Sequence, residues 1–127
     1  MVHVVLPLLC AGAMPFVFTG IAKAGSFTPK DNHETRRWQS QLTGWRQRAH
    51  WAQLNSFEAF PVFAAGVIVA HLAAPGSSAA AIAAWGFIAA RVVYGVCFIT
   101  DQATLRSLVW TLGIACTVAL YVIALVH

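Results

Sequence analysis

The stretch Arg46–Ala73, RQRAHWAQLNSFEAFPVFAAGVIVAHLA, decides how the rest of the sequence is interpreted. Its second half is as apolar as a membrane span, but its first half is rich in charged and amide side chains. On a helix, residues three to four positions apart share a face, so Arg48, Asn55 and Glu58 form one polar stripe. Glu58 then lies roughly 15 Å along the helix from Arg48, a depth at which ionisable residues usually face a bundle interior or a cavity. The stripe predicts either a polar contact that holds helices together or a ligand site.

The composition around this stretch is that of a membrane protein. Of the 127 residues, 59% are hydrophobic and 9% are charged, with a mean hydropathy of +0.70. An ordinary soluble domain carries about 25% charged residues. The length accommodates one domain of about four spans and leaves no room for a separate soluble domain.

The apolar runs and their breakers predict an all-α, integral membrane four-helix bundle that forms a single domain. Its helices are expected at about residues 2–22, 45–72, 78–100 and 105–126. The first run lacks the basic start of a signal peptide, so we expect it to remain as a helix. Residues 25–44 are polar and contain Pro29, which predicts a loop with at most one interfacial turn.

The charge distribution predicts the orientation in the membrane. Six of the eight lysines and arginines lie between Lys23 and Arg48, and Arg106 follows the third apolar run. Both loops lie on one side of a four-helix chain, and the positive-inside rule makes that side cytoplasmic. Loops 23–45 and 101–105 are therefore expected in the cytoplasm and both termini on the opposite side, and this explains the basic cluster better than nucleic-acid binding does.

Further polar residues converge on the level of the stripe. Arg91 and Tyr94 lie on the third helix as it returns to the basic side, and Arg106 and Ser107 open the fourth helix there. The arginines outnumber Glu58, so a pocket between them favours an anion, and Glu58 either accepts an ammonium or pairs with an arginine. A small zwitterion with excess carboxylate fits both signs, and Arg106 is suited to stabilise a thiolate. The cysteines lack ligand spacing, so no metal site is expected.

The same residues resemble a known family. The run RAHWAQLNSFEAFPVF, the ARVVY of the third helix and the TLRS of the fourth resemble the MAPEG family, the membrane-associated proteins of eicosanoid and glutathione metabolism. Its members include microsomal glutathione transferases, prostaglandin E synthase and leukotriene synthase. The resemblance covers nearly the whole chain, and the compact loops resemble the bacterial branch, which implies a bacterial inner membrane.

The resemblance implies a homotrimer in the lipid bilayer that binds glutathione, as co-substrate, between subunits at the cytoplasmic end. The second substrate would be a lipophilic electrophile, and the activity that of a transferase or peroxidase. Arg106 matches the arginine placed near the glutathione sulfur and is the implied catalytic residue. The implied glutathione-binding residues are Arg48, Asn55, Glu58, Arg91, Tyr94 and Ser107.

Three positions depart from the family pattern. Trp51 and Ala59 stand where the leukotriene branch has Arg and Tyr, and Phe98 stands where glutathione-using members commonly have Tyr, which removes a hydroxyl from the pocket. The alternative function is therefore a non-catalytic trimeric membrane protein of the same fold whose pocket holds a lipid. Asp101 is expected to pair with Arg106 or to cap the fourth helix.

Overall fold

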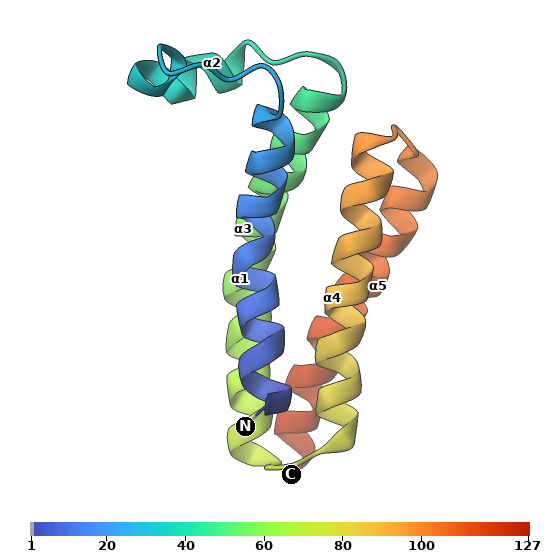
Figure 1. The fold of residues 1–127 in the computed structure, drawn as a ribbon. Helices are drawn as coiled ribbons and strands as arrows, with labels where there is room; N and C mark the ends of the chain where they lie inside the picture. Colours follow the sequence, from blue (N-terminus) through green and yellow to red (C-terminus); the bar gives the residue numbers. More distant parts are fainter. Residues whose placement is uncertain (1) are drawn as a thin grey trace.

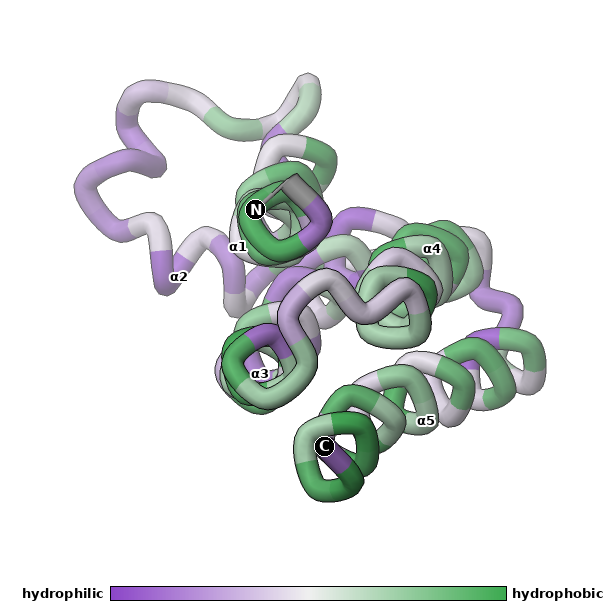
Figure 2. The backbone as a smooth tube through the Cα atoms, turned by 90° about the horizontal axis from the view of Figure 1, so that it is seen from below, coloured by the Kyte–Doolittle hydropathy of each residue, from purple (hydrophilic) through white to green (hydrophobic). Residues whose placement is uncertain are grey.

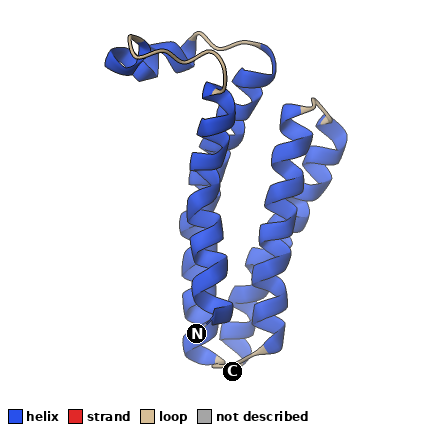
Figure 3. Cartoon of the chain, viewed as in Figure 1, coloured by secondary structure: helices blue, strands red, loops and turns tan. Residues whose placement is uncertain are grey.

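The computed structural model describes residues 2–127, and within them it contains helices and no strand (Figure 3). Its four long helices are α1 (Val2–Lys23), α3 (Gly44–Ala73), α4 (Ser78–Ile99) and α5 (Ala103–Val126). Each is long and apolar enough to cross a membrane. The all-α prediction is confirmed, and the protein is an integral, multi-pass membrane protein. The largest difference in the helix bounds is at α5, which begins at Ala103 rather than at residue 105.

The long helices form two pairs. α1 packs along α3 and α4 packs along α5, while α3 also contacts α4 and α5. The pairs lie close together at the end that carries both termini and diverge toward the end that carries the short helix α2 (Thr35–Ser40), as Figure 1 shows. The turn between α3 and α4 lies at the end with the termini, and the turn between α4 and α5 lies at the end with α2 (Figure 1).

Aromatic rings and small residues fill the space between the helices. Phe63 of α3 and Phe87 of α4 are buried and stack with their ring centroids 3.9 Å apart. Phe18 of α1 packs directly over Gly95 of α4, where a Cβ atom would overlap its ring. Small residues let membrane helices approach closely, and this contact brings α1 against α4 in the half of the bundle nearest α2.

The outward faces of the long helices are apolar. Large hydrophobic side chains stay exposed along them, among them Leu72, Ile82 and Leu125. Viewed along the bundle in Figure 2, the long helices are predominantly hydrophobic and the segment around α2 is hydrophilic. Lipid tails cover such faces at no cost, so the helices suit a bilayer environment.

The segment between α1 and α3 contains more structure than the loop predicted for it. A 3₁₀ helix, η1 (Asp31–Glu34), leads directly into α2. Phe27 meets Trp38 edge-on, with ring centroids 5.0 Å apart, and this contact folds the segment back on itself. The Asp31 carboxylate accepts hydrogen bonds from the N–H and the hydroxyl of Thr28, which hold the pKa of Asp31 below its usual value.

The turn between α4 and α5 depends on one residue in a left-handed conformation. Asp101 has φ +63°, and its N–H and that of Gln102 donate to the carbonyls of Phe98 and Cys97 at 3.3 and 2.8 Å. These bonds form a Schellman motif that ends α4. The prediction that Asp101 pairs with Arg106 or caps α5 was wrong: within residues 2–127 it forms no ion pair, and Gln102 precedes α5.

Candidate functional site

A buried arginine connects α3 and α4 in the half of the bundle nearest α2. Arg91 is 4% exposed, and its guanidinium donates to Asn55 Oδ1 at 2.8 Å and to Ser56 Oγ at 3.1 Å. Ser56 Oγ donates in turn to the carbonyl of Ala52 at 2.8 Å. The guanidinium also lies over the ring of Tyr94, 4.2 Å from its centroid. Buried polar groups need such partners, so the network fixes the facing sides of the two helices.

An open cavity of about 350 Å³, exposed on one side of the bundle, lies beside this network, where α3, α4 and α5 meet. Small-molecule sites begin at about 300 Å³, so its size suits a small ligand. The lining combines charged, amide and aromatic side chains from all three helices. These are Trp51, Leu54, Asn55, Glu58, Tyr94, Phe98 and Arg106.

Aromatic rings form one wall of the cavity, and Arg106 lies on them. Its guanidinium is 4.4 Å from the centroid of the Phe98 ring. Phe98 meets Tyr94 edge-on at 5.5 Å and tilts toward Trp51 at 6.1 Å between centroids. A cation over an aromatic face is attracted by the ring quadrupole, which orients the guanidinium without neutralising its charge.

Glu58 brings the opposite charge to the same cavity. Its carboxylate accepts a hydrogen bond from Asn55 Nδ2 at 3.3 Å, and its side chain is exposed. Within residues 2–127 the single ion pair is Arg37 with Glu34, at 3.0 Å on the surface. The alternative in which Glu58 pairs with an arginine is therefore not found in the described chain. Within the same residues, neither Glu58 nor Arg106 has an ion-pair partner.

Two of the predicted site residues lie outside the cavity lining. Arg48 donates from Nε to the carbonyl of Ile99 at 3.0 Å, which places a cation on the last turn of α4. A cation is favourable there because carbonyl groups point out of a helix C-terminus. Ser107 is exposed and donates to the carbonyl of Ala103 in its own helix at 3.2 Å. Of the other predicted residues, Asn55, Glu58, Tyr94 and Arg106 line the cavity, and Arg91 lies behind its wall.

Two residues at the site were missed by the sequence reasoning. Ser56 accepts from Arg91 and is buried. The signal for it was a polar residue directly after Asn55 of the polar stripe, within an otherwise apolar part of the helix. Leu54 lines the cavity, but an apolar residue in a membrane helix carries no signal of that kind. No group of three residues able to hold a metal ion occurs in the part of the chain that the structure describes.

Chemically, the arrangement presents a carboxylate and a guanidinium across one small cavity with an aromatic wall.

The family model for the MAPEG family matches residues 3–126 of the 127-residue chain. Comparison with curated proteins and with solved structures finds no match. Since the family match spans nearly the full length, and the chain carries four membrane-spanning helices, the protein belongs to the MAPEG family.

Proposed function

We propose that the protein is a glutathione-dependent membrane transferase or peroxidase that acts on lipophilic electrophiles. The observation that carries the proposal is the pair of uncompensated charges in one cavity. Glu58 and Arg106 both line it, and neither forms an ion pair within residues 2–127. A ligand that satisfies both must carry an ammonium and an anionic group, as glutathione does.

Each charge suits one part of glutathione. The Glu58 carboxylate, held by Asn55, accepts the ammonium group. Arg91 uses two of its donors on Asn55 and Ser56, and its buried positive charge behind the wall favours a carboxylate in front of it. The guanidinium of Arg106, a residue of α5, is oriented by the Phe98 ring and suits the sulfur.

The proposed reaction needs glutathione as its thiolate, because the thiolate is the nucleophile. A guanidinium near the sulfur favours the thiolate, and the thiol proton leaves to solvent. With an aryl halide, the sulfur forms a bond to the ring carbon and the halide departs with the electron pair of the broken bond. Arg106 would stabilise the anionic sulfur before attack, and the aromatic wall would hold the apolar electrophile.

A homotrimer is part of the proposal. Glu58 is exposed at the side of a membrane-spanning helix, where an ionisable group costs about 2.5–3.5 kcal/mol in lipid. A second copy that covers this side of α3 would remove Glu58 from lipid and complete the cavity. Crosslinking in mild detergent should then yield trimers, and a clean monomer would contradict this part of the proposal.

The proposed orientation places the cavity at the cytoplasmic side of a bacterial inner membrane. The basic segment and the turn between α4 and α5 lie at one end of the bundle, and both termini lie at the other (Figure 1). Loops rich in lysine and arginine are retained in the cytoplasm. Labelling of single cysteines at residues 30 and 127 in intact cells tests this, with only the latter expected to react from outside.

The function is tested by calorimetry of the detergent-solubilised protein with glutathione and by conjugation of a generic aryl halide. The expected result is binding and turnover in the unmodified protein, both retained in Arg36→Ala. Arg36 is a matched control because it is an exposed arginine of α2 that does not line the cavity. Absence of glutathione binding would contradict the proposal.

A second candidate function rests on Phe98. Its ring lies under Arg106 and offers no hydroxyl to the cavity, so a guanidinium there can hold an anionic lipid head group without activating a thiol. The protein would then be a non-catalytic trimer with a lipid in its pocket. Co-purified lipid that glutathione does not displace, together with absent conjugation, favours this function.

A further inference from the structure

The segment between α1 and α3, with the residues that flank it, carries the whole net charge of the protein. Residues 23–48 contain six basic and two acidic residues, so their net charge is +4 with histidines neutral, equal to that of the full chain. The basic residues are Lys23, Lys30, Arg36, Arg37, Arg46 and Arg48. Because these are lysines and arginines, the segment stays cationic throughout the physiological pH range.

The two acidic residues of the segment compensate little of this charge. Glu34 forms an ion pair with Arg37 at 3.0 Å, and the Asp31 carboxylate accepts hydrogen bonds from the N–H and hydroxyl of Thr28. The other five basic residues of the segment have no ion-pair partner in the described chain, and Lys30 is exposed. The segment therefore presents positive charge that the protein itself does not neutralise.

Aromatic rings hold two of these cations beside the end of α1. Lys23 Nζ lies 4.0 Å from the centroid of the Phe27 ring, and the Arg46 guanidinium lies 4.3 Å from that of Trp45. Arg46 also donates from Nη2 to the carbonyl of Ala24 at 2.9 Å. A ring face orients a cation without neutralising it, so both charges are fixed near the last turn of α1.

The length of α1 gives the depth of the segment in the bilayer. Its 22 residues span about 33 Å, and the hydrocarbon core of a bilayer is about 30 Å thick. Lys23 at its end therefore lies where the lipid head groups begin. Trp38 of α2 packs against the cluster of Ala22, Leu42 and Ala49, which holds α2 near the same level.

The segment extends beyond the side of the bundle. In Figure 1, α2 lies across the direction of the long helices and points away from α4 and α5. Viewed along the bundle in Figure 2, the segment forms a hydrophilic loop beside α1. At the level of the head groups, this position places its cations over the lipid next to the bundle.

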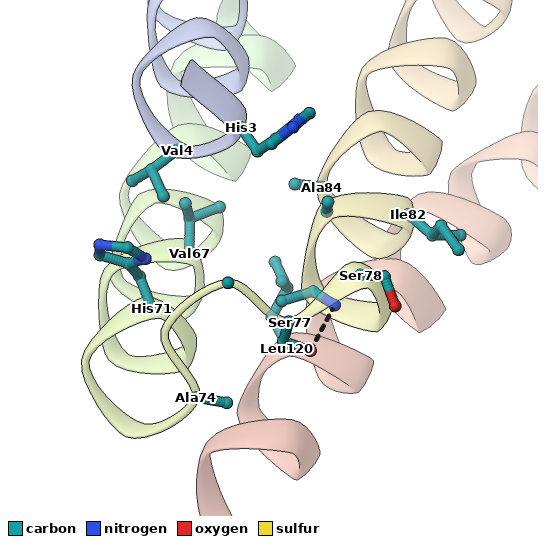
Figure 4. A pocket seen from close by; sticks show the side chains of 13 residues that line it. His3, Val4, Val67, His71, Ala74, Ser77, Ser78, Ile82, Ala84 and Leu120 are labelled. Atoms are coloured by element: carbon teal, nitrogen blue, oxygen red, sulfur yellow. Dashed lines mark hydrogen bonds between the residues drawn. The ribbon is translucent and has the colours of Figure 1, made fainter. Parts of the chain in front are cut away.

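The opposite end of the bundle has no comparable charge. Residues 1–22, 59–90 and 107–127 contain no lysine, arginine, aspartate or glutamate. A cavity of about 330 Å³ lies there beside the turn between α3 and α4, and its polar side chains are two histidines and two serines, labelled in Figure 4. The protein thus presents a strongly cationic surface to only one of the two bilayer interfaces.

We infer that residues 23–48 bind anionic phospholipids of the surrounding bilayer through their head groups. A phosphodiester without an ammonium group, as in phosphatidylglycerol, carries the net negative charge that complements this segment, whereas phosphatidylcholine is neutral overall. Each lysine or arginine near an anionic membrane surface contributes about fivefold in affinity. The inference is independent of the proposed glutathione chemistry, because none of these residues lines the glutathione cavity.

Photocrosslinking of the full chain in nanodiscs tests the inference. The nanodiscs contain equal amounts of phosphatidylglycerol and phosphatidylcholine, with a trace of one or the other carrying a diazirine at the start of an acyl chain. At low salt, the phosphatidylglycerol probe should label residues 23–48 several-fold more than the phosphatidylcholine probe does, and both should label residues 71–78 equally. At about 1 M salt, where the Debye length is about 3 Å, the preference should disappear.

Two double variants separate net charge from other properties of the segment. Lys23→Gln/Lys30→Gln removes two positive charges and should reduce the preference for phosphatidylglycerol several-fold. Glu34→Gln/Arg37→Gln is the matched control, because it changes as many side chains in the same segment but leaves its net charge at +4. The control should keep the preference of the unmodified protein.

Three results would overturn the inference: equal labelling by both probes at low salt, a preference that persists at high salt, or equal losses in the two double variants. A segment that contacts an acidic protein or a second copy of this chain in place of lipid would give the first of these results. The comparison of probes and salt uses the unmodified protein, so it decides the matter even when a variant fails to fold.

Discussion

Glu58 on α3 and Arg106 on α5 line the same cavity without forming an ion pair. Opposite charges that lie close together attract each other and often form an ion pair. Here Asn55 holds the carboxylate and the Phe98 ring holds the guanidinium, each on its own side. The cavity is thereby prepared for a ligand that carries both signs.

The first prediction concerns the network behind the cavity. Asn55→Ala removes an acceptor of Arg91 and should destabilise the protein by about 1.5–3 kcal/mol, the usual contribution of a hydrogen bond to a charged group. Thermal unfolding in mild detergent measures the change. Asn55→Asp keeps an acceptor for Arg91 and should unfold near the temperature of the unmodified protein. Equal stability of the alanine variant would show that Arg91 does not depend on Asn55.

Glu58 should matter for the ligand more than for stability. Because Glu58 has no ion-pair partner in the described chain and glutamine keeps the shape of its side chain, Glu58→Gln should change the free energy of unfolding by less than about 1 kcal/mol. Loss of the charge should weaken glutathione binding about tenfold, measured by calorimetry. Glu34→Gln is the control, since Glu34 pairs with Arg37 on the surface away from the cavity. Unchanged glutathione affinity in Glu58→Gln would contradict the proposed contact between the Glu58 carboxylate and the ammonium group of glutathione.

Gly95 should tolerate no side chain. Gly95→Ala places a Cβ against the ring of Phe18, and overpacking of this kind costs about 1–3 kcal/mol. Gly20→Ala is the matched control, because no atom lies within 4 Å of a Cβ at that helical glycine. Phe18→Leu in the Gly95→Ala background should recover part of the lost stability. Thermal unfolding of the unmodified protein, Gly95→Ala, Phe18→Leu and the double variant measures the coupling, and additive effects would contradict the contact.

Asp101 is the position where a substitution should stabilise the protein. Its φ of +63° is a conformation that glycine adopts without steric cost, so Asp101→Gly should raise the stability by up to about 1 kcal/mol. Asp101→Val, with a branched Cβ, should lower it. Both effects are measured by thermal unfolding. A lower stability of the glycine variant would mean that the Asp101 side chain contributes more than its backbone costs.

The fold follows from the sequence because apolar runs of membrane length have few alternatives to a helix. The expected helix ranges left gaps at residues 73–77 and 101–104, and the structure has turns at both places. The segment around α2 was harder to predict, because its structure depends on the contact of Phe27 with Trp38, which are eleven residues apart. A contact between two residues so far apart produces no periodic pattern in the sequence from which it could be predicted.

The candidate site was predicted in part. Helical spacing placed Asn55 and Glu58 together, and topology brought Tyr94 and Arg106 to their level. Spacing along one helix could not show that Arg48 reaches the end of α4 or that the Ser107 hydroxyl bonds its own helix. It also could not show that Glu58 lacks an arginine partner, since that depends on the positions of α4 and α5 relative to α3.

The central claim is that Arg106 stabilises glutathione as its thiolate, and ultraviolet difference spectroscopy of bound glutathione near neutral pH tests it most directly. Free thiols of this kind are mostly protonated at about pH 7, so thiolate absorbance reports stabilisation by the protein. We predict absorbance in the unmodified protein and in Arg36→Ala, its loss in Arg106→Ala, and partial recovery in Arg106→Lys, because the sulfur requires charge more than fork geometry. Absence of thiolate absorbance in the unmodified protein with glutathione bound would contradict the claim.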